Sequence, residues 1–493
     1  MSILKLEDQD SVALPRRDMY YGGAWHAPSG GRYVTSVNPA TGAEIALVAD
    51  GTKSDVDRAV EEARLGFKVW RHVSPLERAA LLRRIANVVR QNAAELAMLD
   101  ALDCGNPVRE LAADSMVAAM LLDFFAGLVT EIKGSSIPMG PQGVNFSVRQ
   151  PFGVVARILA FNHPFLFCAG KIAAPLAAGN AVIVKPSEQA PLSALRFAEM
   201  IEGILPKGVF NVVTGGAEVG AALASHPKVA KVALVGSVGA GRAVMRSASE
   251  TIKPVLLELG GKNALIAFAD ADPDEVANAI VTGMNFAWCG QSCGSTSRAF
   301  IHQDIHDQVV AKIAEAAARF VPGDPSDDAT SMGALISAAQ HKKVLGYIDS
   351  AIEEGATLLC GGKALNEGNF AKGFFVEPTV FTGVTPSMRI AREEIFGPVV
   401  GVFKWSDEEE MIEAVNSVEY GLTCSIWTQD LGQAHRTAME IEAGYVWVNE
   451  TARHFLGAPF GGFKQSGIGR EESIEELIAF TQEKNIYISL KKP

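Results

Sequence analysis

The 493-residue sequence has few cysteines, no long uninterrupted hydrophobic run and no surplus of basic residues. Its six cysteines include no CxxC pair, which disfavours a disulfide framework and favours a reducing cytoplasm. The longest apolar segments are interrupted, one by Asp123 and the other by Arg157 and His163, so neither is a convincing membrane span. The first residues show no pattern of a secretory signal peptide.

Acidic residues outnumber basic residues by 56 to 44, which gives a formal net charge of -12 with histidine neutral. This charge disfavours nucleic acid and anionic membrane surfaces as partners, because both are polyanions. Hydrophobic residues make up 48% and charged residues 20%, as in a globular protein. A chain of this length exceeds one compact core, so we expect two or three domains.

Short β-rich runs alternate with helical patterns from about residue 151 onward, in one series before Cys293 and a second series after it. Strands buried on both faces have this near-continuous apolar character, so the pattern predicts two successive α/β units with parallel sheets and crossover helices. Before them, helices are predicted over residues 54–70 and 76–104. Segments 133–153 and 485–493 are predicted strands that could pair with each other or with a neighbouring subunit.

Two turns in the first series could bind a nucleotide. Gly236 and Gly241 lie in a strand–turn–helix pattern whose spacing is not GxGxxG, so the usual dinucleotide fingerprint is absent. The helix N-terminus could still donate to a phosphate, although an ordinary βα turn is the alternative. Lys185 and Glu188 follow a buried strand, where they could contact a ribose or phosphate; a solvated loop is the alternative.

A carboxyl group and a thiol also stand in unusual surroundings. Glu258 lies in the apolar run PVLLELGG, which indicates either a buried ion pair or a base with a raised pKa. Small residues surround Cys293, and a helix beginning after it would favour the thiolate, so it is either a nucleophile or a core thiol. Cys289 falls in the preceding helical pattern and is expected to be packed. A zinc site here would need two further ligands, so we predict no metal.

Three other residues are ambiguous when each is taken singly. The Asn162 amide could donate to a developing oxyanion, or simply belong to a turn. Glu394 and Phe396 precede a Gly-Pro turn, where a glutamate is usually a surface residue. Taken one at a time, none of these three residues indicates a function.

Seven motifs follow one another along the chain: FNHP, KPSE, GSxxxG, ELGGK, GQxC, EEIFGPV and PFGGFKQSGIGRE. In this order they resemble the NAD(P)-dependent aldehyde dehydrogenase superfamily, in its non-phosphorylating, hydrolytic type, over essentially the whole chain. The resemblance implies an α/β fold with three parts and a homodimer or homotetramer. These parts are a variant dinucleotide-binding domain (1–125 and 149–258), an α/β catalytic domain (259–460) and a small β oligomerisation domain (126–148 and 476–493).

The resemblance also implies a role for individual residues. Cys293 matches the nucleophile, Asn162 with the Cys293 N–H matches the oxyanion hole, and Glu258 matches the base that activates water. The aldehyde would form a thiohemiacetal with the cysteine, and loss of hydride to the nicotinamide would give a thioester. Water would then hydrolyse the thioester and release the carboxylic acid. Glu188 favours NAD, with NADP as the alternative, because a carboxylate repels a 2′-phosphate. Cofactor contacts are implied for Lys185, Ser187, Glu188, Gly215, Gly236, Ser237, Gly241, Leu259, Glu394 and Phe396.

The expected substrate pocket departs from the family pattern. His163 follows Asn162 where the family often has an aromatic residue, and Gly170 replaces a bulky aromatic on the following helix. These differences predict a roomier, more polar pocket and a bulky or polar aldehyde. Arg453 could meet an anionic substrate or point into solvent. The pocket residues implied are His163, Gly170, Ser292, Arg453, His454 and Phe460.

Three rival functions were weighed against this hypothesis. A coenzyme A-acylating semialdehyde dehydrogenase would not need the water-activating acid that Glu258 supplies. A non-catalytic binding or structural protein on the same scaffold would not need Cys293, Glu258 and Asn162 together. A cysteine hydrolase would need a histidine base near the thiol and would leave the nucleotide-binding turns unexplained.

Overall fold

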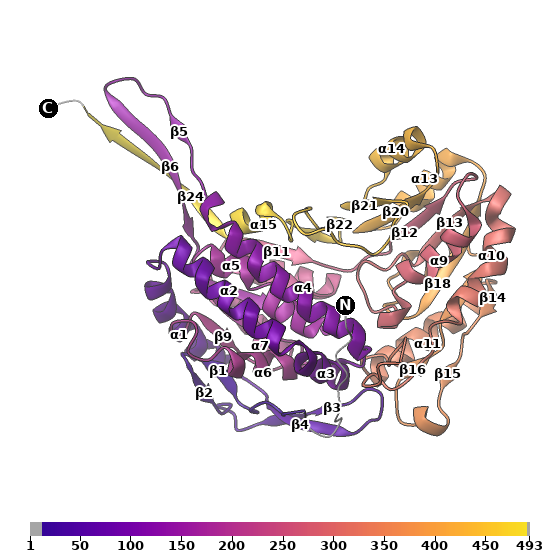
Figure 1. Ribbon diagram of the computed structural model, residues 1–493, viewed down its shortest axis with the longest axis horizontal. Coiled ribbons are helices and arrows are strands. Elements are labelled where there is room, and N and C mark those ends of the chain that lie inside the picture. The colour runs from indigo at the N-terminus through magenta and orange to yellow at the C-terminus, as the bar shows by residue number, and fades with distance from the viewer. Residues whose placement is uncertain (1–11, 491–493) are drawn as a thin grey trace.

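The computed structural model describes residues 12–490 and contains two α/β units with a narrow β extension projecting from the first (Figure 1). The predicted α/β class and the two successive parallel sheets are confirmed. Within the described residues, none of the helices combines the length and the apolar character that crossing a membrane requires.

The first unit is built on an eight-stranded sheet in the order β2-β1-β9-β8-β7-β10-β11-β23. Its central strands, from β9 to β11, are parallel, and β1, β2 and β23 pair antiparallel at the edges. The parallel strands are almost wholly buried, as their continuous apolar runs predict. The strands are β1 Met19–Tyr21, β2 Ala24–His26, β7 Val154–Ile158, β8 Ala181–Lys185, β9 Phe210–Val212, β10 Lys231–Val235, β11 Val255–Glu258 and β23 Gly467–Ile468.

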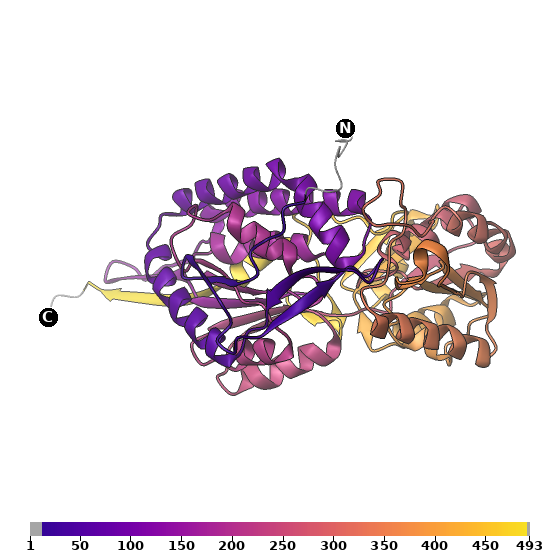
Figure 2. The ribbon, with the colours of Figure 1, turned by 90° about the horizontal axis from the view of Figure 1, so that it is seen from below.

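Helices cover both faces of this sheet, as Figure 2 shows. The first begins at Lys53, one residue before the predicted start, because Asp55 accepts the Thr52 backbone N–H at 2.9 Å and caps it. The long pattern predicted as one helix breaks at Asn92 into two, and the second ends at Gly105 with φ +84°. The helices are α1 Lys53–Trp70, α2 Pro75–Gln91, α3 Ala93–Cys104, α4 Val108–Gly127, α5 Ala173–Ala177, α6 Leu192–Met200, α7 Ala217–Ser225 and α8 Val238–Ser249, with a π-helical turn at Leu166–Gly170.

The second unit contains a seven-stranded sheet in the order β14-β17-β18-β13-β12-β20-β21. All neighbouring strands are parallel except β14, which pairs antiparallel at one edge. The strands are β12 Ala264–Ala267, β13 Arg298–His302, β14 Thr357–Cys360, β17 Thr379–Thr382, β18 Val399–Trp405, β20 Thr423–Trp427 and β21 Tyr445–Val448. The helices are α9 Pro273–Gly283, α10 Gln303–Ala317, α11 Ala338–Glu353, α12 Arg389–Arg392, α13 Glu408–Asn416 and α14 Leu431–Glu440.

Smaller elements lie outside the two main sheets. A hairpin and two short strand pairs lie outside the main sheets, and a short helix precedes the last strand. They are β3 Tyr33–Val37, β4 Glu44–Ala49, β15 Ala364–Leu365, β16 Phe375–Val376, β19 Tyr420–Gly421, β22 Phe463–Lys464 and α15 Ile474–Ala479, with 3-10 turns at Val129–Glu131, Phe286–Trp288 and Gly368–Phe370.

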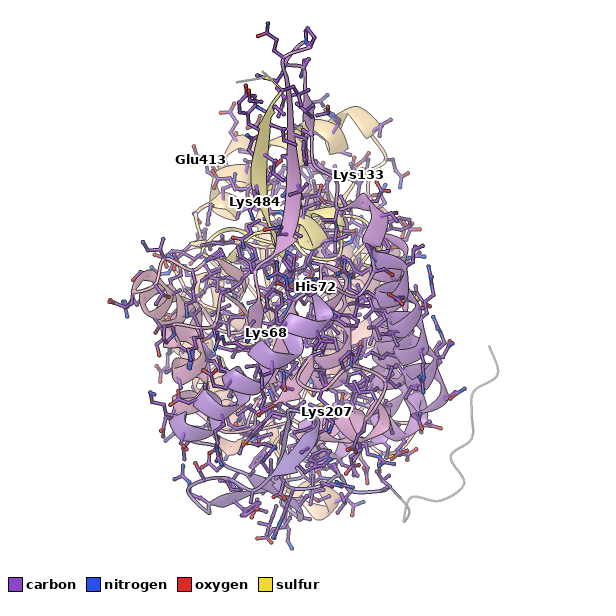
Figure 3. The ribbon with its side chains drawn as sticks, turned by 90° about the vertical axis from the view of Figure 1, so that its left-hand side faces the viewer. Lys68, His72, Lys133, Lys207, Glu413 and Lys484 are labelled. Atoms are coloured by element: carbon purple, nitrogen blue, oxygen red, sulfur yellow. The ribbon has the colours of Figure 1, made fainter. Side chains whose placement is uncertain are left out.

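The projecting extension is a three-stranded sheet of β24 Thr481–Ser489, β6 Gly143–Pro151 and β5 Ser136–Ile137. β6 and β24 pair antiparallel over their whole length, so the two segments that the sequence left open pair with each other. Figure 3 shows Lys484 on this extension, with Lys68 and Lys207 on the body of the protein below it. The predicted domain limits at residues 125 and 148 fall inside α4 and β6.

Candidate active site

A cleft of about 570 Å³ lies at the carboxyl ends of the first unit's parallel strands, where the second unit meets them. In α/β proteins this edge of the sheet is where ligands bind, because loops and helix N-termini converge there. Residues that are far apart in the sequence share its wall. Among the residues predicted from the sequence, the wall includes Asn162, Lys185, Glu188, Gly236, Ser237, Glu258, Leu259, Cys293, Glu394 and Phe396.

Three predicted cofactor residues lie behind this wall instead of on it. The Ser187 hydroxyl accepts the Gln189 backbone N–H at 3.2 Å and shapes its loop. Gly215 has φ +138°, a conformation that L side chains rarely adopt, and its successor Gly216 lines the cleft in its place. A Cβ atom on Gly241 would lie 2.6 Å from Leu259, so this glycine lets α8 pack closely against the wall. These residues support the cleft and do not face it.

The turn between β10 and α8 has the strand–turn–helix form that the sequence predicts. The Ser237 side chain accepts the Ala240 backbone N–H at 3.2 Å and caps α8. Gly236, Ser237 and Ala240 all line the cleft, so the N-terminus of this helix opens onto it. Unpaired N–H groups at a helix N-terminus favour an anion such as a phosphate.

Lys185 and Glu188 form an ion pair at the rim, with 3.0 Å between Nζ and Oε2. The lysine side chain is 5% exposed and the glutamate side chain 52% exposed, so only the carboxylate reaches solvent. Partial burial raises the pKa of Glu188, but the positive charge of Lys185 and the hydrogen bonds from the Glu188 backbone and Lys185 together outweigh burial, and the net shift is downward. The rim therefore carries an ionised carboxylate.

Glu258 closes β11 as predicted and is 4% exposed. Neither of its carboxyl oxygens has a hydrogen-bond partner among residues 12–490. Burial, followed by the negative charge of Glu471, raises its pKa well above the ordinary value, although Lys171 opposes this. The carboxyl group is therefore available to exchange a proton with whatever occupies the cleft.

Cys293 is partly exposed and lines the same cleft. Desolvation, together with the charges of Glu258 and Glu394, raises its pKa to about 12. The predicted helix after this residue is wrong: the chain turns and enters β13, so no helix N-terminus favours the thiolate. Cys289 is 1% exposed at the end of a 3-10 turn, which confirms the prediction that it is packed.

Asn263 fixes the loop that carries the thiol, and the sequence analysis did not identify it. Its buried side-chain amide donates to the carbonyl oxygens of Cys293 at 2.7 Å and Ser295 at 3.0 Å. A Cβ atom on Gly261 would lie 2.6 Å from the Cys293 carbonyl, so the two segments approach as closely as glycine allows. The signal in the sequence was a polar residue directly after ELGGK in an otherwise apolar run.

Glu394 and Phe396 reach the cleft from the second unit. Glu394 Oε1 accepts the Gly261 backbone N–H at 3.0 Å, and burial raises the pKa of this carboxyl group. Phe396 has φ +57°, and its ring meets Phe161 edge-on at 5.7 Å. Gln340, which the sequence analysis missed, also lines the cleft and donates to the Phe396 carbonyl at 2.7 Å. These bonds fix an unusual backbone conformation beside the thiol.

None of the six predicted substrate-pocket residues lines this cleft. His163 Nδ1 lies 2.7 Å from Asp114 Oδ2, and its ring centroid is 5.2 Å from that of Trp288. Ser292 borders a small neighbouring hollow with Phe396. Because His163 adjoins Asn162 in the chain, a polar pair stands beside the thiol-bearing cleft.

Among the remaining pocket predictions, the one for Gly170 is wrong, and Arg453 follows the solvent-facing alternative. A Cβ atom on Gly170 would lie 2.7 Å from Leu121, so helix packing fills the space that this glycine was expected to open. Arg453 is 78% exposed and makes only a 4.0 Å ion pair with Glu450, as expected of a solvent-facing loop residue. His454 lies against Phe460, with their ring centroids 4.4 Å apart.

A cluster of buried charges lies behind Glu258 and was not predicted. Arg157 contacts Glu471 and Glu476, each at 2.6 Å, and Lys171 contacts the other oxygen of Glu471 at 2.6 Å. Burial raises the pKa of Glu471, but the charges of Lys171 and Arg157 outweigh burial and the net shift is downward. Arg157, which interrupts an apolar run, was the visible signal. Within residues 12–490 no group of three or more potential ligands could hold a metal ion.

The two α/β units and the thiol-bearing cleft at a parallel sheet edge define the class of nucleotide-dependent α/β dehydrogenases. The family model described as the aldehyde dehydrogenase family matches residues 25–486, so the chain belongs to the aldehyde dehydrogenase family. The protein is therefore an oxidoreductase that acts on aldehydes.

Individual relatives match over nearly their whole length. Aldehyde dehydrogenase tropH of Talaromyces stipitatus is 50% identical over 97% of this chain and 94% of its own. A betaine aldehyde dehydrogenase of Mesorhizobium japonicum is 43% identical over 97% of this chain and 98% of its own.

Solved structures agree with this assignment. The indole-3-acetaldehyde dehydrogenase of P. syringae, a mutant in complex with NAD+ and IAA, has a TM-score of 0.94 at 37% identity, over 97% of both chains. The NAD+ complex of a Bacillus cereus aldehyde dehydrogenase has a TM-score of 0.93 at 38% identity, over 96% of both chains. The predicted family and fold are confirmed.

Proposed function

We propose that this enzyme oxidises a polar aldehyde to its carboxylic acid with NAD, through a thioester on Cys293. The observation that carries the proposal is the convergence of Cys293, Glu258 and Asn162 on one cleft. A thiol, a carboxyl group without a hydrogen-bond partner in the described part of the chain and a side-chain amide are the groups needed for nucleophilic attack, proton transfer and oxyanion stabilisation.

In this mechanism the Cys293 sulfur attacks the aldehyde carbon, and the thiol proton leaves as the C–S bond forms. Because the pKa of this thiol is about 12, the attack requires a base. The ionised carboxylate of Glu258, on the same cleft wall, receives the proton and passes it to solvent before hydrolysis begins. The oxygen of the thiohemiacetal accepts hydrogen bonds from the Asn162 amide and the Cys293 N–H. A bound nicotinamide would supply the hydride acceptor. Glu258 then removes a proton from the water that hydrolyses the thioester, which releases the acid and restores the thiol.

The cleft has suitable residues for the dinucleotide, and its volume of about 570 Å³ is typical of a ligand site. Lys185 and Glu188 would hold the adenosine ribose, the N-terminus of α8 at Ser237 would face the pyrophosphate, and Glu394 with Phe396 would border the nicotinamide ribose. An ionised Glu188 favours NAD over NADP, because it repels a 2′-phosphate. The related structures that contain NAD+ support the same choice.

The substrate preference is inferred from the polar groups beside the cleft. When His163 donates its Nδ1–H to Asp114, its Nε2 becomes a hydrogen-bond acceptor. The nearby Trp288 Nε1–H is buried and has no partner among the described residues, so it is an unused donor. An aldehyde that carries a polar group could satisfy both. Relatives named for betaine aldehyde and indole-3-acetaldehyde support a preference for substituted aldehydes.

The projecting β extension supports a homodimer or homotetramer. Its strands β5 and β24 are the outer strands of the small sheet, and each leaves one edge open to a further strand. Tyr487 and Ile488 on β24 are exposed, as expected of a surface that another subunit covers.

The proposal is tested by following nicotinamide reduction with NAD and with NADP across aliphatic, aromatic, amino and hydroxy aldehydes. Cys293→Ala should lower turnover at least about a thousandfold, because no other thiol lines the cleft among the described residues. The matched control is Cys289→Ala, which removes a packed thiol four residues away and should retain turnover. Survival of activity in Cys293→Ala would assign the nucleophile to another residue.

A further inference from the structure

Two buried side chains fix the turn that carries Asn162. The Asn106 side-chain amide donates to the backbone carbonyl of Asn162 at 2.8 Å. Three residues further on, the Phe165 backbone N–H donates to Asp100 Oδ2 at 2.9 Å. Asn106 and Asp100 are each 1% exposed, so solvent cannot replace either bond. The turn is therefore held at both ends by α3 and the loop that follows it.

Asn106 is held in place from the second unit. Gly105 ends α3 in the left-handed conformation, with φ +84°. Its carbonyl accepts the Ala334 backbone N–H at 2.9 Å. Two residues later the Ile336 N–H donates to Gln291 Oε1 at 3.1 Å, and Gln291 lies two residues before Cys293. A short series of hydrogen bonds thus connects the anchor of the Asn162 turn to the loop that carries the thiol.

The surroundings of Asn106 indicate that its side-chain N–H group is the part of the residue that matters here. Its Oδ1 is buried and has no hydrogen-bond partner within the described chain, so the side chain carries the cost of an unsatisfied acceptor. An apolar residue would avoid that cost but would leave the Asn162 carbonyl unpaired. Among residues 12–490, the Asn106 side-chain amide is the side-chain donor that the Asn162 carbonyl oxygen accepts from.

We propose that Asn106 is a positioning residue that aims the Asn162 side chain at the oxyanion formed on Cys293. The inference rests on the proposed role of Asn162. Donors to an oxyanion act through preorganised geometry, and a displacement of about 1 Å can cost roughly a hundredfold in rate. Asn106 touches neither substrate nor cofactor in this arrangement; it acts through the Asn162 backbone.

A double-mutant cycle tests the proposal on the full-length enzyme. Asn106→Ala should lower kcat about tenfold to a hundredfold and leave KM for NAD and aldehyde within about twofold. In an Asn162→Ala background the same substitution should lower kcat by less than about threefold, because the group it positions is gone. If Asn106→Ala does not fold, Asn106→Leu keeps a similar volume, removes the donor and serves in the same cycle.

Two controls separate positioning from general stabilisation. Asn180 is a fully buried asparagine whose amide donates to the carbonyls of Pro175 and Phe480, and it does not line the cleft. Asn180→Ala should lower Tm but leave kcat of the folded enzyme unchanged. Asp100→Asn keeps an oxygen for the Phe165 N–H and should retain kcat, whereas Asp100→Leu should lower it.

The possible results distinguish the two hypotheses. Equal losses of kcat from Asn106→Ala in the wild-type and Asn162→Ala backgrounds would overturn the positioning role, as would full activity in Asn106→Ala. If Asn162→Ala itself retains kcat, the proposed oxyanion role of Asn162 fails and the positioning role fails with it. A loss in both single variants, with no further loss in the double variant, supports both.

Discussion

Glu258 and Glu471 are both buried carboxyl groups at the meeting point of the two units, and their surroundings differ sharply. Glu258 has no hydrogen-bond partner among the described residues, and its pKa is raised. Glu471 contacts Arg157 and Lys171 at 2.6 Å each, and its pKa is lowered. Burial acts on both in the same direction, so the neighbouring cations decide the sign.

This difference separates a group that can do chemistry from one that holds the structure. A carboxyl group with a raised pKa and oxygens that no neighbour occupies can take up and release a proton during a reaction. A paired carboxylate stays ionised and fixed, and removing it leaves buried positive charge. Glu471 also contributes directly to the raised pKa of Glu258 through its own charge. The ion-paired Glu471 therefore helps to keep the pKa of Glu258 raised.

Within this comparison of two carboxyl groups, the largest effect should come from Glu258→Gln, which removes the proposed base without changing its shape. Thioester hydrolysis should slow about a hundredfold to a thousandfold, whereas acylation of Cys293 should slow less and remain the faster step. Stopped-flow measurement should then show a burst of one reduced nicotinamide per active site, followed by slow turnover. A variant with wild-type steady-state turnover and no burst would show that Glu258 is not this base.

Substitution of the paired carboxylate should act on stability more than on chemistry. Glu471→Gln should lower the free energy of unfolding by about 3–5 kcal/mol, because Arg157 and Lys171 lose a buried partner. Glu258→Gln should leave that free energy unchanged or raise it, since the wild-type carboxyl group is buried without a partner. Urea unfolding of both variants measures the contrast. Equal losses in the two variants would contradict the distinction.

The contribution of each carboxyl group to the free energy of unfolding should change with pH in opposite directions. For Glu258 the folded pKa lies above the ordinary 4.5, so the unfolded chain ionises first and stability falls as pH rises toward the folded pKa. Thioester hydrolysis should accelerate through that same folded pKa as the base ionises. For Glu471 the folded pKa lies below 4.5, so its contribution to stability is lost as pH falls below 4.5.

Both effects are measured across a range of pH, from the free energy of unfolding and from the single-turnover rate of thioester hydrolysis. In Glu258→Gln the deacylation rate should lose its pH dependence in this range, while in Glu471→Gln the acid loss of stability should shrink. A deacylation rate in wild type that falls with increasing pH would contradict the assignment of Glu258 as a general base.

The smallest effect concerns the pair Lys185–Glu188, in which the half-exposed Glu188 carboxylate is screened by solvent. Glu188→Gln should lower KM for NADP about tenfold and change KM for NAD by less than about threefold, because the repulsion of a 2′-phosphate is removed. Steady-state kinetics with both cofactors measure this change. An unchanged ratio of the two KM values would mean that Glu188 does not select NAD.

Much of the fold could be predicted because its strands carry local signals. The runs that became β7, β8, β10, β12 and β13 are mostly apolar, as expected of strands covered on both faces. The helix expected after Cys293 failed because small residues there serve a turn that packs against the Gly261 segment. The roomy pocket expected at Gly170 failed because Leu121 comes from a helix about fifty residues earlier. Neither contact has a local signal.

By itself the sequence determined the α/β class, because the apolar pattern of buried strands and the residues at helix ends are local signals. It determined the family separately, through the resemblance carried by seven motifs in order. The tertiary structure alone decided that Glu258 would have no hydrogen-bond partner within residues 12–490 and that Glu471 would pair with Arg157 and Lys171. It also placed Asn106 beneath Asn162, 56 residues away in the chain. The reason is physical: desolvation and charge pairing depend on distance in space, which the order of residues does not specify.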